Sequence, residues 1–181
     1  MRLRKERYGY AQIALHWAVV LLVIEQYFSS AGIIRVHAYR PLGRPADPLD
    51  LMLHALHTRI GLLILALVAV RLALRMRWGA PEWPNPLPRW RKRLSSSVQY
   101  GLYAVLIGQA VTGAVAIYLW WPMSTAHKAL FWALAVLLAL HLSGAMLAFV
   151  AWPRETLFRI IGLRLSVSRA VDRPRSSTPT E

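Results

Sequence analysis

Four long apolar runs divide the chain, and they constrain its fold more than any other feature of the sequence. They cover residues 10–34, 51–74, 95–120 and 126–151, and each reaches the ~20 residues that a helix needs to cross a bilayer. Backbone groups in lipid must find hydrogen bonds inside the protein, and apolar runs of this length achieve that as helices. The sequence therefore predicts an all-α fold, an integral-membrane four-helix bundle.

The distribution of charge predicts the orientation of the bundle. The chain has 22 Lys and Arg residues and a net charge of +14, but these residues lie between the apolar runs and form no folded basic domain, so we expect membrane lipid and no nucleic acid as their partner. Seventeen of the 22 lie at the N-terminus, at the end of the second run and in the connection that follows it, or after the fourth run. By the positive-inside rule both termini are cytoplasmic.

We expect one membrane domain over residues 1–165. The connection at 80–88 is rich in proline and cannot be helical. Residues 154–165 alternate Arg with apolar side chains at helical spacing, which predicts a short helix lying on the cytoplasmic surface. Residues 166–181 form a polar tail with the composition of a disordered segment.

Histidine is the residue type that points to chemistry. The chain has no cysteine, which excludes disulfides, iron–sulfur clusters and covalently attached c-type haem. Each of three apolar runs carries histidine, and a polar side chain at membrane depth usually has a function there. The candidates are His16, His57, His127 and His141.

Depth in the bilayer predicts how these histidines pair. With the N-terminus inside, His16 lies near the cytoplasmic surface and His57 near the periplasmic surface. His127 starts the fourth span on the periplasmic side, and His141 follows 14 residues later, ~21 Å deeper on the same face. We therefore expect His57 with His127 on the periplasmic side, and His16 with His141 on the cytoplasmic side. Two pairs of facing imidazoles suit two non-covalent b haems, each with two axial histidines.

Other interpretations remain open for single histidines. A histidine in a span is often only a polar contact between helices, and imidazole also suits copper, zinc or nickel. His54 lies one turn before His57 and is an alternative ligand, a partner for a haem propionate, or a residue that simply faces the periplasmic interface. His37 is expected in a solvated loop.

Charged side chains lie beside the predicted cofactor sites. Arg71 follows His57 by 14 residues, so we expect it at the cytoplasmic haem, either paired with a propionate or extended to the membrane surface. Arg59 and Lys128 lie near the periplasmic haem and are candidates to bind its propionates. Glu25 places a carboxylate inside the first apolar run. This indicates either a buried ion pair with Arg59 or His54, or a proton relay.

Two further features concern the outer loop and the third span. Basic residues of the outer loop predict electrostatic steering of a small anion towards the periplasmic haem; they are Arg35, Arg40 and Arg44, set against Asp47 and Asp50. The third span carries a row of small residues that includes Gly108 and Gly113, which predicts close packing against another helix.

With these residues in place, the chain resembles the bacterial di-haem cytochrome b561 group, which is related to the cytochrome b subunits of nickel–iron hydrogenases. The resemblance covers about residues 5–165 and rests on three segments. These are Arg7-Tyr8 through Leu15-His16-Trp17, then His57 with the span ending Val70-Arg71-Leu72-Ala73-Leu74-Arg75, and His127 with His141.

The resemblance implies two b haems on the four histidines and exchange of electrons with ubiquinone or another membrane quinone. One branch is similar to superoxide oxidases, which pass electrons from periplasmic superoxide to ubiquinone. Some relatives carry histidines at the start of the third span, where this chain has Ser95 to Gln99; Gln99 is a candidate to bond a quinone carbonyl. Two alternatives remain: an anchor subunit that takes electrons from a hydrogenase-type partner, and a non-haem membrane transporter that uses the histidines.

Overall fold

The computed structural model describes residues 8–79, 88–151 and 153. Four long helices make up this part of the chain: α1 (Tyr10–Tyr39), α2 (Pro48–Trp78), α3 (Arg89–Tyr118) and α4 (Ser124–Ala151). Two short 3-10 helices, η1 (Arg40–Leu42) and η2 (Trp121–Met123), lie in the turns. All four long helices are apolar and long enough to cross a membrane, which confirms the predicted all-α membrane bundle. The predicted helix at 154–165, the tail, and most of the proline-rich connection lie outside the described residues.

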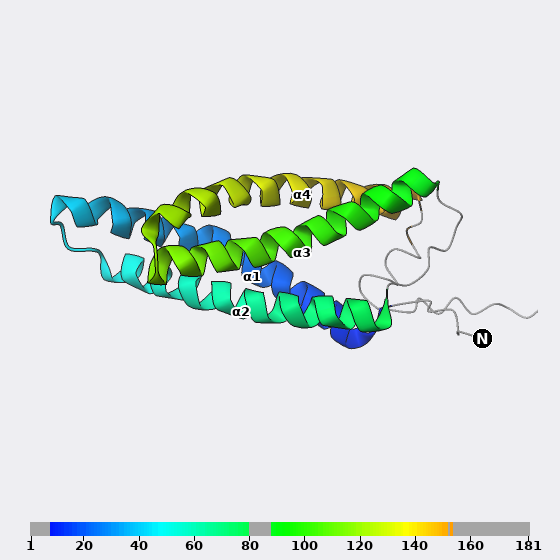
Figure 1. The fold of residues 1–181 in the computed structure, drawn as a ribbon, viewed down its shortest axis with the longest axis horizontal. Coiled ribbons are helices and arrows are strands. Elements are labelled where there is room, and N and C mark those ends of the chain that lie inside the picture. The colour runs from blue at the N-terminus through cyan, green and yellow to red at the C-terminus, as the bar shows by residue number, and fades with distance from the viewer. Residues whose placement is uncertain (1–7, 80–87, 152, 154–181) are drawn as a thin grey trace, which may run out of the picture.

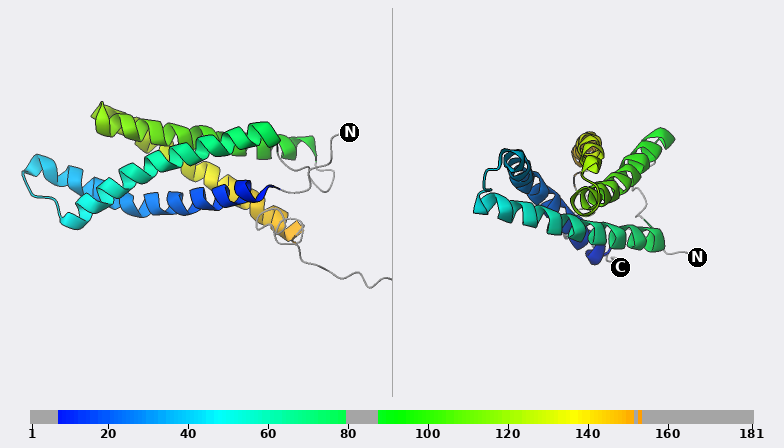
Figure 2. Two further views of the ribbon diagram at one scale, coloured as in Figure 1. Left: turned by 90° about the horizontal axis from the view of Figure 1, so that it is seen from below. Right: turned by 60° about the vertical axis from the view of Figure 1, so that its left-hand side comes forward.

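The helices run up and down, so the bundle has two ends (Figure 1). We call the end with the α1–α2 and α3–α4 turns the hairpin end, and the opposite end, where α1 begins and α4 ends, the terminal end. The α1–α2 turn extends beyond the α3–α4 turn (Figures 1 and 2). Each helix is several residues longer than a bilayer requires.

Local sequence explains where α2 begins and ends. The side chain of Asp47 caps its first turn by accepting a hydrogen bond from the Leu49 backbone N–H at 2.8 Å, and Pro48 occupies the first helical position, where no N–H is needed. Gly79 ends the helix with φ of +69°, a conformation that favours glycine.

Close backbone packing follows the order of the chain. Helix α1 packs along α2, α2 against α3, and α3 against α4, whereas α4 makes little close backbone contact with α1 or α2. The buried apolar core lies among the first three helices and includes Val19, Ile64, Val68 and Tyr103. Most other large apolar side chains are exposed, as expected for a surface that faces lipid.

Glycines permit close helix contacts at two interfaces, between α1 and α2 and between α3 and α4. An added Cβ at Gly32 of α1 would lie 2.5 Å from the Cβ of Leu53 in α2, so only glycine permits this approach. On α3, Gly101, Gly108 and Gly113 face α4, where added Cβ atoms would lie 3.1–3.3 Å from side-chain atoms. The predicted small-residue face of the third span is therefore confirmed as a packing surface.

Candidate functional site

The structure brings the four predicted histidines together as two pairs. The rings of His16 on α1 and His141 on α4 have their centres 6.3 Å apart, with planes at 69°. The rings of His57 on α2 and His127 on α4 have their centres 6.5 Å apart, with planes at 75°. We call the first the terminal pair and the second the hairpin pair, after the ends of the bundle to which they are nearer.

These separations fit a metal between each pair of rings. Imidazole nitrogens bind transition metals at about 2.0–2.1 Å, so two rings on opposite sides of one metal have centres roughly 6–6.5 Å apart. Within the described residues, no group of three His, Cys, Asp or Glu side chains forms a closed metal site. Each pair also joins helices whose backbones do not pack closely. The residues therefore fit a haem with two axial imidazoles.

A buried hydroxyl contacts the ring of His57. Its Nδ1 lies 3.1 Å from the Oγ of Ser29, a fully buried residue of α1. The Ser29 hydroxyl is also 3.1 Å from the backbone carbonyl of Glu25, to which it can donate its single proton. With that proton directed to the carbonyl, Ser29 accepts from the Nδ1–H of His57, and this tautomer leaves Nε2 to bind a metal.

The same logic applies to His127. Its Nδ1 lies 3.0 Å from the backbone carbonyl of Gln109 and 3.3 Å from the Oγ1 of Thr112. The carbonyl can only accept, and the Thr112 hydroxyl donates to the backbone carbonyl of Gly108 at 2.7 Å. His127 is thus also protonated on Nδ1 with Nε2 free. Gly113 makes room for this ring, since an added Cβ would lie 3.1 Å from its Cε1.

The terminal pair has different surroundings. The buried Nδ1 of His16 has no hydrogen-bond partner among the described residues. Arg71 lies within electrostatic range of both His16 and His141. Its guanidinium lies over the ring of Tyr103, 5.7 Å from the ring centre. Arg71 therefore reaches the level of the terminal pair, as its spacing from His57 predicted.

A second arginine lies one turn further along α2. The guanidinium of Arg75 is 5.4 Å from the centre of the Tyr100 ring, and it donates to the hydroxyl of Tyr8 at 3.4 Å. Nearby on α3, the side-chain amide of Gln99 donates to Ser95 at 3.1 Å. The terminal end therefore combines cationic and phenolic groups near Gln99, the residue predicted as a candidate to bond a quinone.

His54 is engaged elsewhere. Its Nε2 lies 3.3 Å from the Nε2 of His37, and the His37 ring stacks on Trp121 with ring centres 4.0 Å apart. The expectation that His37 lies in a solvated loop is wrong, because α1 continues to Tyr39. His57, and not His54, is the α2 histidine whose ring faces His127.

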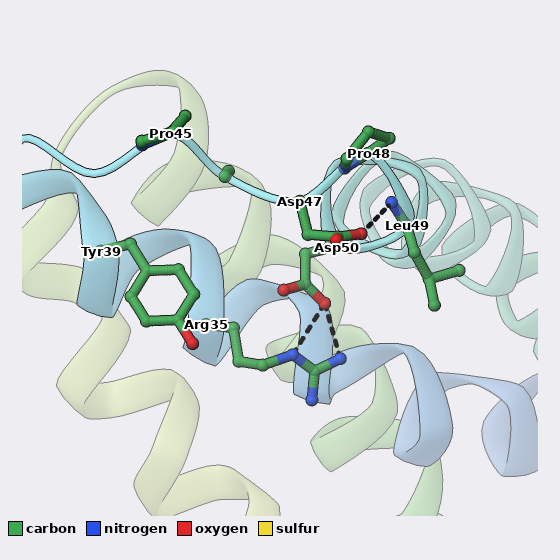
Figure 3. Close-up of a pocket in the computed structure, with 8 residues that line it drawn as sticks. Arg35, Tyr39, Pro45, Asp47, Pro48, Leu49 and Asp50 are labelled. Atoms are coloured by element: carbon green, nitrogen blue, oxygen red, sulfur yellow. Dashed lines mark hydrogen bonds and ion pairs between the residues drawn. The ribbon is translucent and has the colours of Figure 1, made fainter.

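The predicted ion pair of Glu25 is also wrong. In the part of the chain that the structure describes, the one ion pair joins Arg35 to Asp50, with both guanidinium contacts on the same carboxylate oxygen at 2.6 and 2.7 Å (Figure 3). The Glu25 carboxylate instead accepts from the side chain of Gln26 at 3.1 Å. That amide also donates to the backbone carbonyl of His57 at 3.0 Å. The side chain of Gln26 therefore connects the Glu25 carboxylate to the backbone of His57.

Other charged candidates remain on the surface. Arg59 and Lys128 are exposed, as are Arg40 and Arg44 in the α1–α2 turn. Arg35 is neutralised by Asp50, and Asp47 is used as the cap of α2. The hairpin end thus keeps exposed positive charge after the pairing of Arg35 with Asp50.

Sequence reasoning missed the residues that support the histidines. Ser29 and Thr112 contact imidazoles, and Gln26 bonds the backbone of His57, but none of the three is among the predicted site residues. A signal was present in α1, where Glu25, Gln26 and Ser29 place polar groups on one side of an apolar span. Thr112 lies among the small residues of α3, where its hydroxyl gives no separate sequence signal.

Fold and site together define a multi-pass membrane bundle in which one helix supplies a histidine to each of two pairs between helices. Residues 7–163 match the family model of prokaryotic cytochrome b561. The match covers most of the chain, so the chain belongs to the prokaryotic cytochrome b561 family. The family is one of membrane haem-b proteins that transfer electrons, which removes the alternative of a non-haem transporter.

Proposed function

We propose that this protein binds two b haems, one held by His57 and His127 and the other by His16 and His141. We further propose that it passes single electrons across the bacterial inner membrane, between a periplasmic donor and the quinone pool. In this arrangement the hairpin end is periplasmic and the terminal end cytoplasmic.

The observation that carries the proposal is the pairing of histidines from different helices at two depths. Both ring separations, 6.3 and 6.5 Å, suit two imidazoles on one metal. The free Nε2 atoms of His57 and His127 support the same assignment.

Haem held by His57 with His127, and by His16 with His141, would supply a one-electron iron couple at each pair. The protein contributes orientation and charge. Ser29, Gln109 and Thr112 fix the rings of the hairpin pair, and Arg71 places a cation at the terminal pair. This arrangement favours electron transfer through the haem edge over binding of oxygen.

Haem stoichiometry in the purified protein tests the assignment. Wild-type protein should contain two b haems per chain by pyridine haemochrome. His127→Ala and His141→Ala should each retain one, and the double variant none. His37→Ala, a histidine of the same bundle outside both pairs, should retain two. One haem in the wild type, or loss in His37→Ala, would contradict the proposal.

We propose superoxide as the donor, because the hairpin end exposes Arg40, Arg44, Arg59 and Lys128, and positive potential steers small anions. A superoxide source should reduce the oxidised protein, giving sharp low-spin bands. Addition of a soluble ubiquinone analogue should then reoxidise it. Reduction by dithionite alone, together with co-purification of a second redox protein, would instead favour the hydrogenase-type anchor subunit.

A further inference from the structure

The polar groups around the two histidine pairs differ in kind. In the hairpin pair both imidazoles donate their Nδ1–H to protein acceptors: His57 to Ser29, and His127 to the carbonyl of Gln109 with Thr112 nearby. In the terminal pair the buried Nδ1 of His16 has no acceptor among the described residues.

This difference changes the electronic character of the ligands. An imidazole that donates its second N–H to an oxygen becomes a more basic ligand. More basic axial ligands stabilise the oxidised iron, which lowers the reduction potential of the site. The hydrogen bonds therefore favour a lower potential at the hairpin pair than at the terminal pair.

Charge at the hairpin pair comes from one part-buried carboxylate and from exposed cations. Arg59 and Lys128 lie beside the ligand residues in the sequence but are exposed, so water and salt screen their charges more than that of the part-buried carboxylate. The side-chain amide of Gln26 joins the Glu25 carboxylate, at 3.1 Å, to the backbone carbonyl of His57, at 3.0 Å. A negative charge held this close to a ligand helix disfavours the arrival of an electron. No cation forms an ion pair with Glu25 in the described part of the chain.

The terminal pair carries the opposite charge. Arg71 is half-buried over the ring of Tyr103 and lies within electrostatic range of both His16 and His141. Among the described residues no carboxylate forms an ion pair with it. A cation in a partly buried site stabilises an added electron, because the surroundings screen it less than water does.

We infer that these residues hold the hairpin site at the lower reduction potential and the terminal site at the higher one, so that electrons run from the hairpin end to the terminal end. The inference rests on the proposed two-haem arrangement. It assigns a direction to electron transfer through the two haems. The electron donor reacts at the hairpin end, and the acceptor, a quinone in the proposed function, takes electrons at the terminal end.

A spectroelectrochemical titration of the purified full-length protein tests this inference. Two b-type components should appear. Glu25→Gln should raise the reduced-to-oxidised ratio of the lower component about tenfold at a fixed potential, an upward shift of about 59 mV for one electron. Arg71→Gln should lower that ratio for the higher component by about the same factor. Each variant should leave the other component nearly unchanged.

Matched controls separate local effects from damage to the fold. Ser30→Ala removes a neighbouring hydroxyl that bonds the Tyr27 carbonyl at 2.7 Å and faces no histidine. Arg77→Gln removes an exposed cation near the end of α2. Neither should shift either component. If Glu25→Gln does not accumulate, Ser29→Ala provides the second test, and it should also raise the lower component.

The outcomes distinguish the inference from the proposed function. Fewer than two b haems per chain by pyridine haemochrome would refute the two-haem assignment itself. Two haems per chain that titrate as a single component would refute only the direction. So would a shift of the higher component by Glu25→Gln or Ser29→Ala.

Discussion

Replacing Gly113 with Ala is the sharpest test of how α3 supports the hairpin pair. The added Cβ would lie 3.1 Å from Cε1 and 3.3 Å from Nδ1 of His127. Carbon atoms prefer separations of about 3.5–4.0 Å, so the ring must move by roughly 0.4–0.9 Å. The bond from Nδ1 to the Gln109 carbonyl, now 3.0 Å, would then approach or pass the ~3.2 Å limit for a good hydrogen bond.

The expected magnitude follows from that lost support. Loss of a partner that orients a metal-bound histidine typically costs about 10–100-fold in affinity. We therefore expect haem at the hairpin pair to bind about 10–100-fold more weakly in Gly113→Ala. The helix itself should not suffer, since Ala is favoured over Gly in helices by about 0.8–1.0 kcal/mol. The assay is haem retained per chain after dilution into haem-free detergent buffer, alongside the thermal midpoint of the helical signal.

Gly108→Ala is the matched control, because its added Cβ would lie 3.2 Å from Cδ1 of Leu130. The clash is similar, but the end of a leucine side chain can rotate away. Equal haem loss in both variants would show that general helix packing is responsible. Full haem retention in Gly113→Ala would refute the position assigned to the His127 ring.

Three further predictions concern helix packing, ligand choice and steering. Gly32→Ala should lower the thermal midpoint, because its Cβ would lie 2.5 Å from that of Leu53 and overpacking costs about 1–3 kcal/mol; Gly61→Ala, with its nearest contact at 3.6 Å, should not. His57→Ala should lose one haem by pyridine haemochrome and His54→Ala none; the reverse result would exchange their roles. Raising ionic strength should slow reduction by superoxide but not by a neutral reductant, and an unchanged superoxide rate would exclude steering.

The sequence predicted the helices well because a membrane leaves few choices. Each apolar run became one helix, and the depth argument grouped His57 with His127 and His16 with His141. Hydropathy and the helical rise are enough for both inferences. Hydropathy marks only the apolar part of a helix, however, and α1 continues through Arg35 to Tyr39. That is why His37 was assigned to a loop and its contact with His54 was missed.

The hydrogen bonds of the site could not be predicted in the same way. Whether Ser29 faces His57 depends on how α1 rotates against α2, and that rotation is set by the close contact at Gly32. The pairing of Glu25 failed for a related reason: Gln26, the next residue along the chain, occupies its carboxylate, and Arg59 is exposed. Sequence spacing gives depth and approximate face, but contacts between helices require the packed structure.

Helix α4 explains why both sites depend on the same packing surface. It supplies one histidine to each pair, 14 residues apart, while its close backbone contacts are with α3 and η2. Three glycines of α3 set its position, because Gly101, Gly108 and Gly113 meet Leu137, Leu130 and His127 in antiparallel order. A slide of α4 by one turn, about 5.4 Å, would displace His127 and His141 together. The glycines of a helix that carries no ligand therefore hold both histidine pairs in register.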